Sequence, residues 1–155
     1  MKKLYPIIAL CLVAINGCQL STGRQQDKTQ FFQRFSLYDT INRMNVPQIT
    51  CSASFSTGVS GGVGEVTSFR KDSSLDCEVI SPAFDESAFT SGLRTEIEQE
   101  IVNGGARVTG SGETGPNFHC EYQDGGIHGA IEVVAGRVEA NKYKLTYIIR
   151  EYLWK

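Results

Sequence analysis

Two histidines and two glutamates towards the end of the sequence have side chains of the types that bind metals or transfer protons: His119, Glu121, His128 and Glu132. Gly125-Gly126 lies among them and predicts a tight hairpin turn, because glycine accepts positive φ. With that turn, His119 faces Glu132 and all four side chains share one face of the hairpin. His119 and His128 still lie too far apart to share a zinc ion, whose ligands stand at about 2.0–2.3 Å. We expect a cross-strand His–Glu pair on a solvated face, without a metal or another cofactor.

Nucleophilic catalysis has no clear pattern in this sequence. No Gly-x-Ser-x-Gly elbow occurs, and the serines fall mainly where loops and outer strand faces are expected. Cys120 and His128 are a conceivable thiol–imidazole pair, but alternation along a strand points Cys120 to the face opposite the histidines. We therefore expect no catalytic residue, and the sequence favours a protein that is not an enzyme.

Three of the five cysteines fall in the part of the chain that is expected to fold. Cys51 and Cys77 lie on short alternating segments that fit one local sheet, so we favour a disulfide between them. Such a bond stabilises a fold by roughly 3–4 kcal/mol in the chain-entropy model. Cys120 is then left over, and we expect it to be a buried small apolar residue.

The last strand, Tyr143 to Trp154, carries apolar residues on both faces. Ile148, Tyr152 and Trp154 lie on the face opposite the one formed by Tyr143 and its alternate neighbours. Either the strand is covered twice, for example by the first helix, or it exposes an aromatic patch to a partner. We favour burial and keep these three residues as partner-binding candidates, because Tyr and Trp are enriched at interface hot spots.

The elements that must position these residues begin with a helix from Thr29 to Asn45. Asp27 and Gln30 form a passable capping box, and Asn45 with Pro47 supplies the end. Apolar residues recur there every three or four positions, at Phe31, Phe35, Tyr38, Ile41 and Met44.

A second helix is the most regular element in the sequence. Ser81-Pro82 is its expected entry, with Asp85 as the alternative cap, and residues 103–105 end it. Its apolar positions have a four-residue spacing, at Phe89, Leu93, Ile97 and Ile101.

Alternating segments predict the strands. Ile49–Phe55 is a half-buried strand, the glycine-rich residues 56–66 a flexible hairpin loop, and Asp72–Ser74 a turn before a short strand at 75–79. The last fifty or so residues read as an antiparallel meander, with a turn at Gly112–Asn117. We predict an α+β fold: an antiparallel sheet of four to six strands with a C-terminal meander, packed with one or two helices.

The N-terminus carries an export pattern. Met1-Lys2-Lys3 is basic, Leu4–Ile15 is an apolar run too short for a typical membrane-spanning helix, and Gly17 precedes Cys18. This segment resembles the lipobox of bacterial lipoproteins, in which the chain is cut before the cysteine and the new N-terminus carries acyl chains. The resemblance implies a signal peptide at 1–17, a lipidated N-terminus and polar tether at 18–28, and leaves 29–155 as a single domain.

The same resemblance implies a location in the cell. Acyl chains such as palmitate on Cys18 hold a protein at a membrane, almost permanently when there are two or three of them. Gln19, rather than Asp, follows Cys18, which is similar to lipoproteins sent to the outer membrane. We therefore expect a domain anchored at the bacterial cell envelope, at the outer membrane, and facing the periplasm.

Charge excludes one class of partner. The chain has 15 basic and 17 acidic residues, and removal of Lys2 and Lys3 with the signal leaves 13 basic ones, a net charge of about −4. Binding to nucleic acid requires a basic patch that neutralises phosphates, so we expect no nucleic acid partner.

These observations favour an envelope lipoprotein that binds another envelope protein as an assembly or accessory factor. The alternative is a module that holds a small molecule or lipid between helices and sheet, which requires a sizeable apolar cavity. A third hypothesis, an envelope hydrolase, requires a cleft in which an acid, histidine or cysteine has a strongly shifted pKa.

Overall fold

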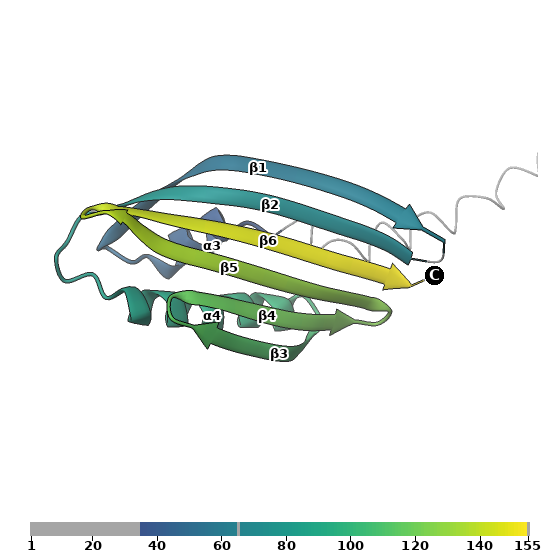
Figure 1. Cartoon of the computed structure of the whole chain (residues 1–155). Coiled ribbons are helices and arrows are strands. Elements are labelled where there is room, and N and C mark those ends of the chain that lie inside the picture. The colour runs from purple at the N-terminus through teal and green to yellow at the C-terminus, as the bar shows by residue number, and fades with distance from the viewer. Residues whose placement is uncertain (1–34, 65, 155) are drawn as a thin grey trace, which may run out of the picture. The chain divides into compact units, whose positions relative to one another are not determined.

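One antiparallel sheet and two helices make up the part of the chain that the computed structural model describes, residues 35–64 and 66–154. The strands lie in the order β1-β2-β6-β5-β4-β3 (Figure 1). This confirms the α+β class and the C-terminal meander. The elements along the chain are α3 (Leu37–Met44), β1 (Ile49–Val63), β2 (Val66–Val79), α4 (Glu86–Asn103), β3 (Arg107–Thr114), β4 (Asn117–Asp124), β5 (Ile127–Glu139) and β6 (Lys142–Trp154).

Helix α4 follows its sequence pattern closely. Asp85 caps the N-terminus of α4 by accepting a hydrogen bond from the Ala88 N–H at 3.0 Å. Just beyond its C-terminus, Gly105 has a positive φ of 89°, which turns the chain away from the helix. The expected entry at Ser81-Pro82 is wrong, because these residues belong to a turn that precedes the cap. The four apolar residues of the predicted face are all buried: Phe89, Leu93, Ile97 and Ile101.

Helix α3 differs from its prediction. It begins at Leu37 after the cap Ser36 and ends at Met44, followed by the C-cap Asn45, whose φ is 50°. The predicted stripe is wrong at Tyr38, which is 37% exposed, whereas Leu37 and Ile41 are buried. Phe35 precedes the helix and is buried, and Ile41 and Met44 of the predicted stripe contact the core, so Tyr38 is the residue at which the stripe fails and Leu37 takes its place. The rest of the prediction, Asp27, Gln30 and Phe31, lies outside the described residues.

The first hairpin also differs from its prediction. Residues 56–63 continue β1, and Asp72–Ser74 lies inside β2, so neither is a loop or a turn. The two strands pair from Ile49 opposite Val79 to Val63 opposite Val66. Pairing of β2 with β6 along nearly its whole length, together with hydroxyl bonds such as Ser54–Ser74 at 2.8 Å, outweighs the turn preference of serine, aspartate and glycine.

The meander has the predicted register at its central hairpin. His119 lies opposite Glu132 and Gln123 opposite His128, on either side of the turn at Gly125. The predicted turn at Gly112–Asn117 is shorter than expected, because β3 continues to Thr114.

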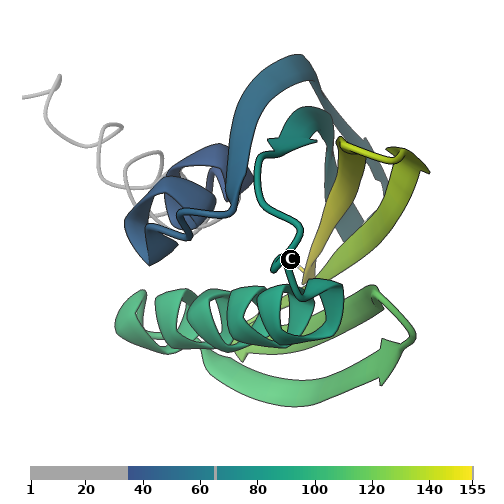
Figure 2. The same cartoon turned by 90° about the vertical axis from the view of Figure 1, so that its left-hand side faces the viewer.

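Both helices pack on one face of the sheet, the inner face. Figure 1 draws them behind the sheet, and Figure 2 shows both on its concave side. Phe35 meets Tyr147 of β6 with ring centroids 5.7 Å apart, and Phe84 beside α4 meets Tyr143 of β6 at the same separation. Thr40 of α3 donates a hydrogen bond to Glu100 of α4 at 2.7 Å. The opposite side, the outer face, has no helix from the described part of the chain.

The disulfide predicted between Cys51 and Cys77 is present in the structure. The two residues are directly opposite each other on β1 and β2. The bond closes the end of the first hairpin that lies nearest the core, since both cysteines are buried.

Candidate functional site

The outer face of the sheet displays the polar half of each alternating strand. On β6, Lys144, Ile148, Arg150 and Tyr152 alternate with residues that are buried on the inner face. Their neighbours on β2 are polar, whereas the outward residues of β5 include Ala130 and Val134 beside Glu132 and His128, so β6 runs through a broad mixed surface open to solvent.

Two arginines stand directly opposite each other at the centre of this face. Arg70 of β2 is the cross-strand partner of Arg150 of β6. Like charges so placed repel, and each arginine has its own carboxylate that offsets the repulsion. Arg70 contacts Asp72 through two hydrogen bonds of 2.8 and 3.0 Å, and Arg150 contacts Glu132 of β5 at 2.5 Å. The hydrogen bond to Asp72 raises the pKa of Arg70 above its ordinary value.

Apolar groups flank these ion pairs. Tyr152 lies between Ser68 and His128 and is 44% exposed, whereas Ile148 is half-buried between Asp72 and Glu132. The surface therefore presents aromatic, aliphatic and guanidinium groups side by side. We call the following residues the Arg150 cluster: Arg70, Asp72, Glu132, Ile148, Arg150 and Tyr152.

The favoured prediction for this face, burial under the first helix, is wrong for Tyr152. Both described helices lie on the inner face, because the apolar half of β6 is the larger and more continuous half. Ile148 and Tyr152 therefore lie together on the open face. Trp154 ends β6, and its side chain lies outside the described part of the structure.

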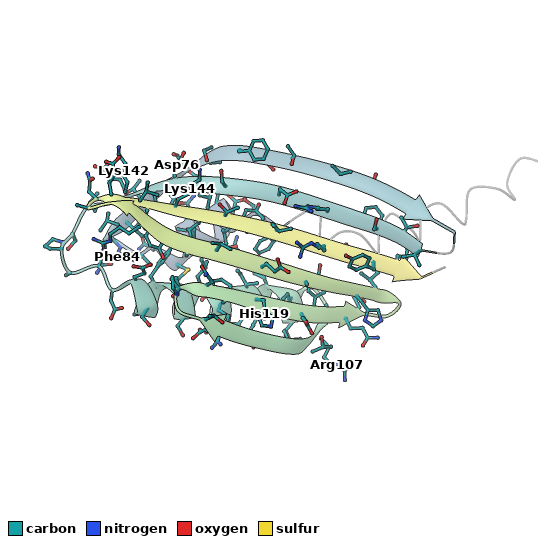
Figure 3. The ribbon with its side chains drawn as sticks, viewed as in Figure 1. Asp76, Phe84, Arg107, His119, Lys142 and Lys144 are labelled. Carbon is teal, nitrogen blue, oxygen red and sulfur yellow. A yellow bond between two sulfur atoms is a disulfide. The ribbon has the colours of Figure 1, made fainter. Side chains whose placement is uncertain are left out.

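The histidines do not converge. His119 faces Glu132 and His128 faces Gln123 and Tyr152, so the two rings are four residues apart along the hairpin, about 14 Å. His119 instead packs over Gly112, where an added Cβ would lie 2.8 Å from the imidazole. Among the described residues, no three His, Cys, Asp or Glu side chains are grouped closely enough to hold a metal ion. Figure 3 labels His119 on β4, away from Lys142 and Lys144 at one end of the sheet.

Cys120 is a buried residue with no exposed surface. Burial, with a smaller contribution from Glu98, raises the pKa of its thiol to about 12. Its side chain lies on the inner face, whereas His128 lies on the outer face. The structure therefore separates the thiol from the imidazole that would have to activate it.

Sequence reasoning missed a buried polar pair on the inner face. Tyr122 of β4 reaches across Gly129 of β5 and donates a 2.5 Å hydrogen bond to Glu151 of β6. A Cβ at Gly129 would lie 2.1 Å from the tyrosine ring, so only glycine leaves room for this crossing. Burial and the neighbouring Glu151 raise the pKa of Tyr122 above its ordinary value. The available signal was a glycine opposite a tyrosine in the predicted hairpin.

A hollow of about 550 Å³ lies beside the disulfide, at the end of the sheet where β5 turns into β6. Asp76, Lys142 and Lys144 mark its position in Figure 3. Asp76 opposes Lys144, and Glu78 opposes Lys142. Charges of both signs alternate around this hollow, so it has no clear preference for an anion or a cation.

Comparison with known proteins places the chain in no family. No family model matches it, and no curated protein matches its sequence. Among solved structures, the chain is similar to LpqN, described as involved in cell envelope biogenesis of Mycobacterium tuberculosis. The TM-score is 0.37 and the identity 7%, over 78% of this chain and 86% of that chain, which is too distant to transfer a function. Neither described helix has the length and apolar character needed to cross a membrane.

Proposed function

We propose that this chain is a non-enzymatic accessory factor of the cell envelope that binds another protein through the Arg150 cluster. The observation that carries this proposal is the open outer face, with Tyr152 and Ile148 on either side of Arg150. The export and lipobox pattern at Cys18 supports the envelope as the place of action, with the anchor at the outer membrane.

The chemistry of the Arg150 cluster favours a protein as the partner. Tyr and Arg are the residues most enriched at interface hot spots, where they combine apolar area with directional hydrogen bonds. Each arginine already has one carboxylate, so the cluster is close to neutral and suits a partner with mixed polar and apolar groups better than a polyanion. It is also a flat sheet surface, which fits a macromolecule better than a small molecule.

The pre-organised ion pairs add to this argument. Arg150 is held by Glu132 and Arg70 by Asp72, so little side-chain entropy is left to lose when a partner binds. A strand is also a rigid support for binding side chains. The cluster is therefore suited to specific recognition.

Site-specific crosslinking in intact cells tests the proposal. A photoreactive phenylalanine analogue in place of Tyr152 should give one main protein adduct, since this position lies in the proposed interface. Adding Arg150→Ala should lower the adduct yield at least about fivefold, because loss of a hot spot costs more than about 1 kcal/mol.

The matched control is Val102, an apolar residue of α4 that is 57% exposed. The same analogue at Val102 should give no such adduct. The proposal fails if Tyr152 gives no adduct, or if both positions give the same set of adducts.

A further inference from the structure

The two edges of the sheet differ in how they are protected. At one edge, β3 is short, carries Arg107 and Glu113, and is interrupted by a bulge between Val108 and Gly110. Arg94 of α4 also reaches Glu113 at 3.3 Å. Charges, bulges and covering elements are the devices that keep an edge strand from pairing with another chain.

The other edge, β1, lacks most of these devices. It is 15 residues long, Ile49–Val63, and contains neither a charged residue nor a proline. Residues 52–62 are exposed, and no described element lies on the open side of that stretch. In an antiparallel strand, alternate residues direct their N–H and C=O groups away from the neighbour, so β1 presents a row of backbone groups to solvent.

The bulge in β1 limits the regular part of this edge. It lies between Ala53 and Phe55, and from Phe55 to Val63 the strand pairs with β2 without interruption. Val59 is the middle residue of that stretch. Two exposed apolar residues, Phe55 and Val59, therefore lie four positions apart on the outer side of this stretch.

We propose that two copies of the chain pair through β1, antiparallel, about a two-fold axis at Val59. In this register Val59 faces its own copy and Phe55 faces Val63 of the second copy. Val59, which is 64% exposed, then has an apolar cross-strand neighbour in its own copy, and Phe55, which is 54% exposed, lies beside the strand of the second copy. The proposal does not depend on the Arg150 cluster, which lies on other strands.

Charge and shape both favour a second copy as the occupant. β1 contributes no charged side chain, so two identical copies can meet along it without like charges facing each other. The inner side of β1 in this stretch has only small residues, Ser56, Gly58, Ser60 and Gly62, so no side chain obstructs the approach. A two-fold contact uses the same surface twice and closes, and the protected edge at β3 prevents further addition.

Cysteine trapping of the full-length chain tests the register. Val59→Cys places two thiols on the axis, where they should form a reducible dimer, as the directly opposite Cys51 and Cys77 do on β1 and β2. Phe55→Cys is the matched control on the same face of the same strand. Its two thiols would be eight residues apart, about 27 Å, and should give no dimer above the level of the unmodified chain.

The mass of the full-length protein in detergent, measured by light scattering, gives a second readout. The unmodified chain should be a dimer, and Val59→Lys should make it a monomer by placing two ammonium groups together. Val134→Lys, on the exposed outer side of β5, should stay a dimer. A monomeric unmodified chain overturns the proposal, as does equal trapping at positions 59 and 55. An adduct of Val59→Cys with a different protein also overturns it and assigns the edge to a foreign strand.

Discussion

At the scale of single residues, side-chain burial decides which groups are available for chemistry. Cys120 is the only free cysteine among the described residues, and burial keeps its thiol protonated. The sequence predicted that Cys120 is buried because a free cysteine usually behaves as a small apolar residue, and strand alternation placed it on the face opposite the histidines. The size of the pKa shift depends on the packing of α4 over β4, which no local pattern specifies.

Cys120 should make stability depend on pH in the alkaline range. Its pKa is raised from 9.0 to about 12 in the folded state, so its contribution is complete below pH 9 and is lost as pH rises through that interval. Between pH 8 and 10 the unfolding free energy should fall by about 1.4 kcal/mol more in the unmodified chain than in Cys120→Ala. Denaturant titrations at both pH values measure the difference. An equal fall in unfolding free energy between pH 8 and 10 for the unmodified chain and Cys120→Ala would contradict the prediction.

At the scale of elements, the second helix and the meander were predictable, and the first hairpin was not. Repeated four-residue spacing and a tight glycine turn are local signals, and they correctly placed α4 and the β4–β5 register. Residues 56–66 are rich in serine and glycine, which locally favour loops. Residues 56–63 nevertheless form strand, because their partner strand β2 is itself paired with β6, a contact between segments far apart in the sequence.

The crossing of Tyr122 over Gly129 joins β4, β5 and β6 and should matter for stability. Gly129→Ala should cost about 2–4 kcal/mol, because the new methyl group displaces the ring and breaks its hydrogen bond to Glu151. Gly136→Ala on the same strand is the control. No atom lies within 4 Å of its added Cβ, so it should change stability by less than about 0.5 kcal/mol. Equal unfolding free energies for the two variants would show that the crossing is unimportant.

At the scale of the whole molecule, the placement of both helices on one face determines which surface can meet a partner. The sequence left two arrangements open for the first helix, since β6 has apolar residues on both faces. The structure places α3 beside α4, so the outer face and the β1 edge stay accessible on the described part of the chain.

The proposed anchor makes a prediction at this same scale. Cys18→Ser should abolish incorporation of a palmitate analogue and release the protein from the membrane fraction, because Cys18 is the expected acceptor. Cys120→Ala should leave both properties unchanged, since that thiol is buried. A Cys18→Ser protein that remains acylated and membrane-bound would refute the lipobox interpretation.

By itself the sequence determined the fold class and the face of α4 that is buried, and it favoured the disulfide between Cys51 and Cys77 that the structure contains. These depend on hydrophobic periodicity, turn residues and strand alternation, which act over a few neighbouring residues. Only the tertiary structure decided that Arg70 and Arg150 stand opposite each other, that Tyr122 reaches Glu151, and that β1 is an edge strand of the sheet. These features depend on strand order, and strand order is fixed by contacts between distant segments that share one core.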